Sequence, residues 1–454
     1  MNTQHFQYIV EIERTRSISQ AAKNLYLSQP NLSRVLHELE EQLGFAIFER
    51  TSRGVMPTDR GALFLQYARR ILMEMESIEA LELYLYRDGA AAFAQDFDAD
   101  EGRSHIITDV ADIGKSISVF SETLLYYSRT FRRKTIMSKI TVIGAGSVGA
   151  AIANDLTIQG IASEIVLIDI NTQKARGEAL DIYQGAHFGT PTIVRAGDYE
   201  DAADSDVVII TSGLPRKAGQ TRLELAQSNV NIIKQIAPQV VPHAPKALYI
   251  IVSNPVDVLT YVFHKISGLP ENQIIGSGTI LDTSRLQAQL AKQFRVSPKN
   301  VHAHVYGEHG DSSFVPWSLA NISNNHVDYY ATHSPDMDRI DWTCDQAARD
   351  KAEEYVRTSG AQVIKDKGAT FFAVAMSVCH ICKCIFSGAG TALTVSTMMH
   401  GEYGIDDVCL SVLTIVDRNG VRGKILSKLT EEEEAKLRNS ADKLKSVLQQ
   451  ISLV

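Results

Sequence analysis

A glycine-rich turn between a buried strand and a helix constrains the fold of this chain more than any other feature. The apolar run 140–143 leads into GAGSVG, and a helical stretch follows. In such a turn Gly144 permits the sharp bend, Gly146 lets backbone amides approach a pyrophosphate, and Gly149 lets helix and strand pack closely. A second strand, ending at residue 168, is followed by Asp169, whose carboxylate would bind a ribose diol and repel a 2′-phosphate. The sequence therefore predicts a Rossmann unit that binds NAD.

The pattern of apolar and polar residues changes twice along the 454 residues of the chain. Residues 1–87 carry closely spaced helical patterns, residues 88–136 are heterogeneous, and from Met137 apolar strands alternate with helices. This alternation is typical of a parallel α/β sheet, and a chain of this length exceeds one compact core. The letters MSK at 137 look like the start of a separate protein, so either two genes are fused or an intergenic stretch is translated. We expect a helical module at 1–87, a linker without an assigned fold at 88–136, a doubly wound Rossmann domain at 137–283, and an α+β catalytic, substrate-binding domain at 284–454.

Composition and charge patterning favour a cytoplasmic protein. Charges between Glu11 and Arg16 interrupt any signal-peptide core, and nowhere do about eighteen apolar residues run together, as a membrane span requires. The five cysteines are odd in number and lie in the C-terminal part, which argues against a disulfide framework. The net charge of −8 gives no sign of polyanion binding overall, although a small DNA-reading module is compatible with that average.

Residues 17–39 have the pattern of two helices joined by a tight turn. Ala21, Ala22 and Leu25 form an apolar face of the first helix. Ser28 and Pro30 are suited to begin the second helix as its N-cap and first-turn residue. Short polar side chains and one arginine at the exposed start of that helix are what major-groove reading requires. These side chains belong to Gln29, Asn31, Ser33 and Arg34.

The segments AAKNLYLSQPNLSRVLHELEEQLG and FAIFERTSRGVMPTDRG resemble the winged helix-turn-helix of LysR-type transcriptional regulators, over Met1 to about Leu72. We expect an N-terminal all-α winged helix-turn-helix with a β-wing over 48–58, and the resemblance implies a linker helix over 58–86. The effector-binding domain of the family is missing. Lys and Arg only balance Glu over the first 57 residues, so non-specific DNA affinity should be modest. We expect this N-terminal unit to bind DNA through Gln29, Asn31, Arg34 and Arg53. The alternative is a helical unit that binds no ligand.

Further along the chain, residues suited to reduction of a 2-keto acid occur in motif-sized groups. The reaction needs a held carboxylate, a polarised carbonyl, a proton donor and exclusion of water. In VYGEHGD, His309 can give a proton to the new alkoxide and take it back in oxidation. In LDTSR, Asp282 can pair with His309 and raise its pKa. Arg285, one helical turn on, can grip a carboxylate with two parallel hydrogen bonds.

Two loops complete this predicted site. The Gly- and Pro-containing segment 213–225 is suited to act as a lid, and Arg222 on it would polarise the substrate carbonyl. The SNP turn after the strand ALYIIV places the amide of Asn254 near the nicotinamide. We interpret His302 and His304 as structural.

Across Met137 to Val454 these motifs resemble the L-lactate/malate dehydrogenase family. The resemblance implies an NAD-dependent oxidoreductase for a small 2-keto or 2-hydroxy acid, assembled as a homodimer or homotetramer without membrane contact. It implies a proton relay of His309 and Asp282, a carboxylate anchor at Arg285, a polariser at Arg222, a substrate and cofactor contact at Asn254, and a pocket residue at Thr370.

The substrate itself is left open between lactate and malate. GSGTILDTSR, GEHGDSSFVPWSLANI, KGATFF and RNGVRG resemble the lactate branch. Lactate enzymes usually carry Gln on the lid where this chain has Arg216, and malate enzymes carry Arg. A lid arginine would pair with the second carboxylate of oxaloacetate, whereas against the methyl of pyruvate it would be a desolvated, unpaired charge. Lactate is favoured by total resemblance and malate is the alternative; a DNA-binding regulator that senses NADH is the competing class.

Two further patterns concern ligands. The letters CHICKC at 379–384 lie inside a helical stretch without a second ligand pair nearby, which favours apolar packing and no metal. Many bacterial lactate dehydrogenases are activated by fructose 1,6-bisphosphate, held by an Arg and a His. The His position matches His302, but the Arg position is Gln287, which predicts little activation because an amide cannot replace a guanidinium on phosphate.

Overall fold

The chain divides into two units, one within residues 1–128 and one within residues 129–454. Among the described residues, no helix is both long and apolar enough to cross a membrane. Several sequence-based expectations lie outside the described residues: the fold of 88–136, the linker helix beyond residue 69, and the places of Arg53 and Arg216. The structure, a computed structural model, describes residues 3–69 apart from 26, 52–53, 59, 63 and 66, and residues 138–452 apart from 216–218 and 220.

The N-terminal unit consists of helices packed with a two-stranded hairpin. Ser17 caps the second helix, because its Oγ accepts the Gln20 N–H at 3.3 Å. The third helix ends at Gly44, whose φ of +75° is a left-handed value that favours glycine. The hairpin confirms the expected β-wing. The elements are α1 (Thr3–Thr15), α2 (Ile18–Asn24), α3 (Gln29–Leu43), β1 (Phe48–Thr51) and β2 (Gly54–Pro57).

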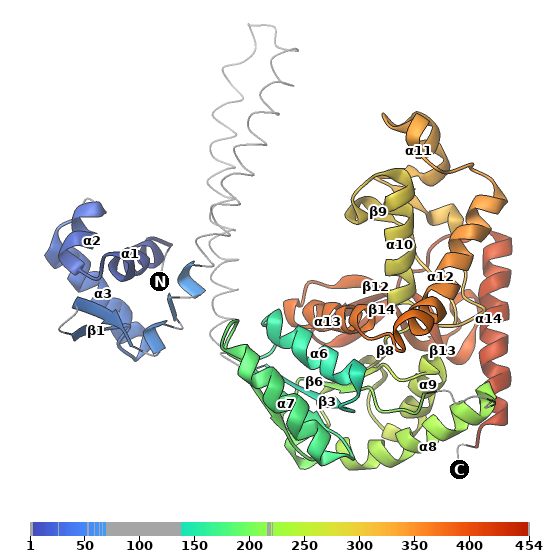
Figure 1. Ribbon diagram of the computed structural model, residues 1–454, viewed down its shortest axis with the longest axis horizontal. Coiled ribbons are helices and arrows are strands. Elements are labelled where there is room, and N and C mark those ends of the chain that lie inside the picture. The colour runs from blue at the N-terminus through green and yellow to red at the C-terminus, as the bar shows by residue number, and fades with distance from the viewer. Residues whose placement is uncertain are drawn as a thin grey trace, which may run out of the picture. The chain divides into compact units, whose positions relative to one another are not determined.

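The larger unit, coloured from teal to red in Figure 1, is built on a nine-stranded sheet. Its strand order is β14-β13-β12-β8-β7-β6-β3-β4-β5. Strands β3 to β8 pair in parallel, and β12, β13 and β14 add an antiparallel extension. The extension joins the parallel part through Ser396 of β12, which lies opposite Gly276 of β8. The strands are β3 (Lys139–Ile143), β4 (Glu164–Ile168), β5 (Ile193–Ala196), β6 (Val207–Ile210), β7 (Leu248–Ile251), β8 (Ile274–Gly276), β12 (Thr391–His400), β13 (Asp406–Asp417) and β14 (Gly420–Lys424).

Helices cover both faces of this sheet. Alternate strand residues enter different cores: Val142 belongs to a core that includes residues of α6, α7 and α13, whereas Ile143 belongs to one that includes residues of α8, α9 and α14. This period of two is what a strand buried on both faces requires. The helices are α6 (Ser147–Ile158), α7 (Thr172–Ala186), α8 (Arg222–Val240), α9 (Val256–Ser267), α10 (Ile280–Phe294), α12 (Gln346–Lys367), α13 (Phe372–Ser387) and α14 (Glu431–Gln450).

A third core lies between α10, α12 and a small three-stranded sheet. Trp317 and Trp342 are neighbours there, with ring centroids 5.4 Å apart. The small elements are β9 (Val301–His302), β10 (Asn321–Ile322), β11 (Asn325–His326) and α11 (Val327–His333), with short 3-10 helices at Glu200–Ala202, Glu271–Gln273, Pro298–Asn300, Trp317–Leu319, Met337–Arg339 and Glu402–Gly404.

The expected fold class is confirmed: a doubly wound Rossmann sheet, a C-terminal α+β part and a winged helix-turn-helix. The border expected between residues 283 and 284 falls inside α10. Because β12 pairs with β8, the C-terminal part and the Rossmann part share one sheet.

Candidate active site

The predicted cofactor turn lies where the strand order reverses. Strand β3 has β4 on one side and β6 on the other, and ligands of doubly wound sheets bind at the carboxyl ends of strands at such a point. Gly144 follows β3 with φ +108°, and a Cβ there would lie 2.7 Å from Thr211 Oγ1. A Cβ on Gly149 would lie 1.8 Å from the Gly144 carbonyl oxygen, so helix and turn touch as predicted.

Gly146 differs from the other two glycines because it faces open space. A Cβ at this position would meet no described atom within 4 Å. Gly146 is the N-cap of α6, and no described side chain caps that helix end. The first backbone amides of α6 are therefore available to an anion, as a pyrophosphate requires.

Asp169 stands at the carboxyl end of β4, across from the glycine turn. Its Oδ2 accepts the Ala145 N–H at 2.7 Å, and its Oδ1 accepts the Asn171 N–H at 2.8 Å. These bonds fix the carboxylate, and each oxygen keeps a lone pair for a hydroxyl donor. The residues thus fit the pyrophosphate and ribose of NAD.

The structure brings the predicted proton relay together at the start of α10. Asp282, 5% exposed, lies in the first turn of this helix, shortly after β8 ends. Its Oδ2 lies 2.5 Å from His309 Nδ1, and its Oδ1 accepts a hydrogen bond from Arg285 at 2.9 Å. One carboxylate therefore orients both the imidazole and the guanidinium.

Electrostatics in this cluster favour a protonated imidazole. The Asp282 carboxylate raises the pKa of His309 to about 9, against the opposing effect of burial. Burial by itself disfavours ionised Asp282, but the charges of His309 and Arg285 hold its pKa below the usual value. With Nδ1 engaged by Asp282, Nε2 is the ring atom that can exchange a proton with a ligand.

A further acidic residue near His309 was missed by the sequence analysis. Asp257 in α9 is 2% exposed, and its Oδ2 accepts the backbone N–H of His309 at 2.7 Å. Burial raises its pKa to about 6, against hydrogen bonds from Ser396 and the His309 amide. The available signal was one acidic residue in the otherwise apolar run VDVLTYVF.

Arg222 of the predicted lid contacts the loop that carries His309, which the sequence did not indicate. Arg222, the first residue of α8, forms an ion pair of 2.5 Å with Asp311, two residues beyond His309. Both side chains are exposed, at 67% and 70%. Sequence analysis did not assign a role to Asp311. The other lid arginine, Arg216, lies outside the described residues.

The remaining predicted substrate contacts lie on connections between elements. Asn254 follows β7 and precedes a cis peptide bond to Pro255. Its carbonyl oxygen accepts a hydrogen bond from Asn229 at 2.7 Å, and the same Asn229 side chain accepts the Leu214 N–H at 2.8 Å. The start of the lid segment is thus tied to the Asn254 turn. Thr370 lies between α12 and α13, half-buried.

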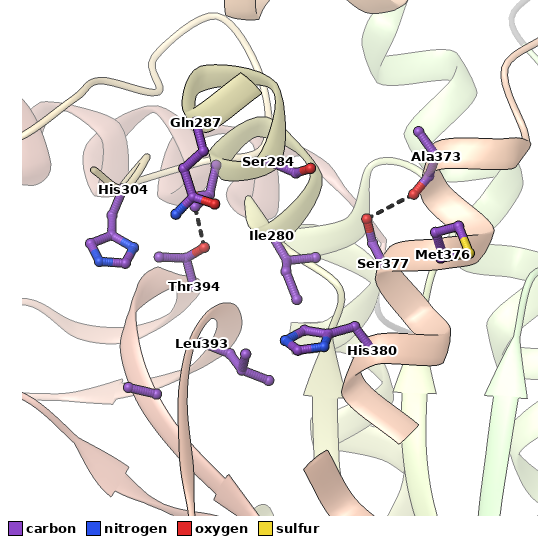
Figure 2. A pocket seen from close by; sticks show the side chains of 12 residues that line it. Ile280, Ser284, Gln287, His304, Ala373, Met376, Ser377, His380, Leu393 and Thr394 are labelled. Carbon is purple, nitrogen blue, oxygen red and sulfur yellow. Dashed lines mark hydrogen bonds between the residues drawn. The ribbon is translucent and has the colours of Figure 1, made fainter. Parts of the chain in front are cut away.

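A cavity of about 500 Å³ is lined by residues of α10 but does not include Asp282, Arg285 or His309. Figure 2 shows Ser284 and Gln287 of α10, His304 after β9, and Ser377 and His380 of α13 around it. The α10 residues at the cavity recur at helical spacing, and neither Asp282 nor Arg285 is among them. Burial lowers the pKa of His304 to about 4, so this side chain adds no positive charge to the cavity lining at neutral pH.

The cysteine-rich stretch lies within α13. Cys379, Cys382 and Cys384 are all buried, and burial raises their pKa values. Within the described ranges, no three His, Cys, Asp or Glu side chains gather as metal ligands would.

The predicted DNA-reading residues lie on the exposed start of α3. Gln29, Asn31 and Arg34 are exposed, and Arg34 donates to Glu38 at 2.9 Å and to Asn31 at 3.1 Å. Ser28 stands at the N-cap position, but no capping bond from a described amide reaches its side chain.

Comparisons with known proteins agree with this geometry. The family "lactate/malate dehydrogenase, NAD binding domain" matches residues 138–276, and "lactate/malate dehydrogenase, alpha/beta C-terminal domain" matches residues 279–453. The family "bacterial regulatory helix-turn-helix protein, lysR family" matches residues 3–62.

Individual relatives cover the larger unit. The chain is 45% identical over 314 residues to L-lactate dehydrogenase 1 of Clostridium acetobutylicum, a match that spans 69% of this chain and 98% of that protein. It is 44% identical over 320 residues to an L-lactate dehydrogenase of Clostridium botulinum, spanning 70% and 99%. The crystal structure of minor L-lactate dehydrogenase from Enterococcus mundtii, in a ligands-bound form, matches with TM-score 0.66 and 36% identity over 70% and 99% of the two chains. This chain therefore belongs to the lactate/malate dehydrogenase family, whose NAD-binding and C-terminal domains it carries after a lysR-family helix-turn-helix segment.

Proposed function

We propose that residues 138–454 catalyse the NAD-dependent interconversion of a 2-keto acid and an L-2-hydroxy acid, with pyruvate and L-lactate as the preferred pair. The observation that carries the proposal is the contact of Asp282 with both His309 and Arg285. This cluster follows the carboxyl end of β8, in the same sheet whose β3 and β4 end at the cofactor turn and Asp169. When bound, NAD accepts or supplies the hydride.

His309 is the proton carrier of this proposal. In keto-acid reduction its Nε2–H donates to the carbonyl oxygen as that oxygen becomes an alkoxide, and in oxidation the neutral ring takes the proton back. Asp282 holds Nδ1 and stabilises the imidazolium, which keeps the ring in one orientation. Because the pKa of His309 is raised to about 9, reduction is favoured at neutral pH and oxidation at higher pH.

Arg285 anchors the substrate carboxylate. Its Nη1 is engaged by Asp282, and its side chain is 16% exposed, so the guanidinium is held in place. Gly360 of α12 lies against it: a Cβ there would be 3.3 Å from Nη2. A fixed guanidinium with donors left for a carboxylate presents the substrate carbonyl to His309 in one orientation.

Arg222 polarises the carbonyl in this scheme and must first leave Asp311. The pair is exposed at both ends, and such pairs contribute about 0–1 kcal/mol, so exchange of partner costs little. The developing negative charge on the substrate oxygen then replaces the carboxylate of Asp311 as the partner of Arg222.

Pyruvate is preferred over oxaloacetate on the strength of the named relatives. Both Clostridium proteins are named L-lactate dehydrogenase. Thr370 and the LEL sequence after Arg222 resemble the lactate branch and support the same substrate. Arg216 supports malate, because it offers a partner to a second carboxylate. Steady-state rates with pyruvate and oxaloacetate, measured side by side on the full chain with NADH, test the proposal. No turnover of either acid would contradict the proposal. Faster reduction of oxaloacetate than of pyruvate would mean that oxaloacetate and malate are the preferred pair.

A second function is supported by the N-terminal unit. The exposed polar side chains at the start of α3 and the β1–β2 wing favour DNA binding by the lysR-type segment. Titration of the full chain with DNA duplexes at rising salt tests it: affinity should fall as phosphate contacts release counterions. Absence of binding to any duplex at low salt would favour a unit that binds nothing. NADH sensing by the dehydrogenase unit requires that NADH change this affinity.

A further inference from the structure

Asp257 is a buried carboxylate that the mechanism above does not use. It lies in the first turn of α9 and is 2% exposed. Its neighbours Val256, Val258 and Leu259 are all buried apolar residues. Placing a carboxylate among such residues is unfavourable unless hydrogen bonds and charges compensate, so its partners indicate what it does.

Both oxygens of Asp257 have partners from other parts of the fold. Oδ1 accepts the hydroxyl of Ser396 in β12 at 2.6 Å, and Oδ2 accepts the backbone N–H of His309 at 2.7 Å. Ser396 itself lies opposite Gly276 of β8, where the two parts of the large sheet join. The carboxylate therefore ties the loop that carries His309 to α9 and to the centre of the sheet.

The backbone amides of four consecutive loop residues are anchored in this way. The acceptors for the amides from Tyr306 to His309 are, in order, Phe314 O at 2.9 Å, Ser411 O at 2.9 Å, Ser440 Oγ at 2.8 Å and Asp257 Oδ2 at 2.7 Å. Only the last of these four acceptors is a carboxylate. A charged acceptor forms the stronger bond, and it stands at the residue whose ring must be oriented.

We propose that Asp257 is a positioning residue of the proposed dehydrogenase reaction: it fixes the backbone of His309, and its negative charge favours the protonated imidazole. The inference rests on the proposed function only for its kinetic consequences. Asp282 holds the ring from its Nδ1 side, and Asp257 acts through the backbone of the same residue. The catalytic loop is thus placed between two buried carboxylates.

The charges around Asp257 agree with this role. From the catalytic loop, His309 stabilises its ionised form and Glu308 opposes it. From β13 it faces Cys409, whose thiol pKa is raised well above its usual value by burial and then by Asp257. From β12 it faces the uncharged Ser396. His309 is therefore the favourable ionic partner of Asp257 among these groups, and loss of this carboxylate must lower the pKa of His309.

Asp257→Asn tests the inference because an amide keeps the shape and can still accept the His309 N–H. For pyruvate reduction by the full chain, kcat/KM falls as pH rises through the pKa of His309, and in the variant this midpoint should shift downward by about one pH unit. The matched control is Asp407→Asn. Asp407 is a carboxylate that contacts α9 through Tyr261 and Lys265, so its loss changes the net charge equally and should leave the midpoint in place.

A direct titration separates this inference from the proposed function. The His309 ring is followed by NMR in histidine-labelled protein, with its signal assigned by loss in His309→Gln. A lower His309 pKa in Asp257→Asn, absent in Asp407→Asn, supports the role even if the true substrate differs from pyruvate. An unchanged His309 pKa overturns it, even if the wild type reduces pyruvate.

The wild type provides a test that needs no variant at Asp257. Because burial raises the pKa of Asp257 to about 6, the His309 signal should show a second, smaller inflection near that pH. In Ser396→Ala, which removes a hydrogen bond to the ionised carboxylate, this inflection should move to higher pH. A His309 signal without such an inflection in both proteins contradicts the charge coupling.

Discussion

The helix-turn-helix unit and the dehydrogenase unit place similar ion pairs in opposite surroundings. Arg34 and Glu38 on α3 are 2.9 Å apart with side chains 66% and 51% exposed, whereas Arg285 and Asp282 on α10 are 2.9 Å apart with side chains 16% and 7% exposed. At equal distance the exposed pair is screened by water and contributes about 0–1 kcal/mol. The buried pair is screened far less.

This difference in exposure indicates how each unit would select its ligand. In the dehydrogenase unit, burial already fixes the donors and charges that the proposed substrate would meet, so the proposed site is organised before binding. On α3, Arg34 would have to release Asn31 and Glu38 to make the proposed base contact, and only a bound duplex would exclude the water. We therefore expect substitutions to have effects that decrease from the buried cluster to the exposed surfaces.

The largest effect is expected for His309→Asn. The variant removes the proton donor but keeps a polar side chain, so kcat/KM for the keto acid should fall by about 10²–10⁴-fold. Binding of NADH, measured by its fluorescence, should remain near the wild-type value because the cofactor turn is untouched. Retention of most activity would show that the buried cluster is structural.

A smaller effect is expected for Arg216→Gln on the lid. An arginine that contacts a substrate carboxylate contributes about 1.5–3 kcal/mol, so the ratio of kcat/KM for pyruvate over oxaloacetate should rise about 10- to 100-fold. Absorbance assays with NADH measure both acids in parallel. An unchanged ratio would mean that this side chain faces solvent when the lid closes over the substrate.

Arg34→Ala should act mainly on DNA specificity. Loss of one base contact lowers affinity for the preferred duplex by about tenfold and leaves binding to unrelated duplexes nearly unchanged. Arg53→Ala is the matched control, because loss of a phosphate contact weakens all duplexes alike and reduces the salt dependence. Equal losses on all duplexes in both variants would contradict base reading by α3.

The smallest effect is expected from fructose 1,6-bisphosphate. Gln287 donates its Nε2–H to the Ala303 carbonyl at 3.2 Å and is an uncharged residue of the cavity lining. The KM for pyruvate should change by less than about twofold on addition of the bisphosphate, because an amide is a weak phosphate ligand. Gln287→Arg serves as the comparison, and a clear gain in pyruvate affinity by the wild type would refute the prediction.

The local part of the cofactor site was predictable from sequence, because its signals are local. The bend at Gly144, the close packing at Gly149 and the place of Asp169 depend on backbone geometry within one βαβ unit, and the structure agrees with these three expectations. The contact between His309 and Asp282 was also expected, since two motifs with complementary chemistry pointed to each other. Their roles in catalysis remain predictions.

Contacts set by tertiary packing were not predictable. Asp257 lies 52 residues from His309, and nothing local to α9 indicates that its carboxylate meets a backbone amide of a distant loop. The pair of Arg222 with Asp311 joins two exposed segments whose charges have many potential partners. Ser28 takes the N-cap position that its sequence indicates, yet the expected capping bond is not formed there.

The pairing of β12 with β8 also has a consequence for biogenesis. Without β12, β8 would be the open edge of a hydrophobic parallel sheet, a surface prone to pair with other chains. Strand β12, which covers this edge, follows β8 by more than a hundred residues. Leu437 and Leu444 of α14, which belong to one core of the sheet, come later still. Contacts of such long sequence separation form late and slowly. A ribosome must therefore synthesise the chain through α14 before the NAD-binding half can close, and chaperone dependence should be concentrated in that interval.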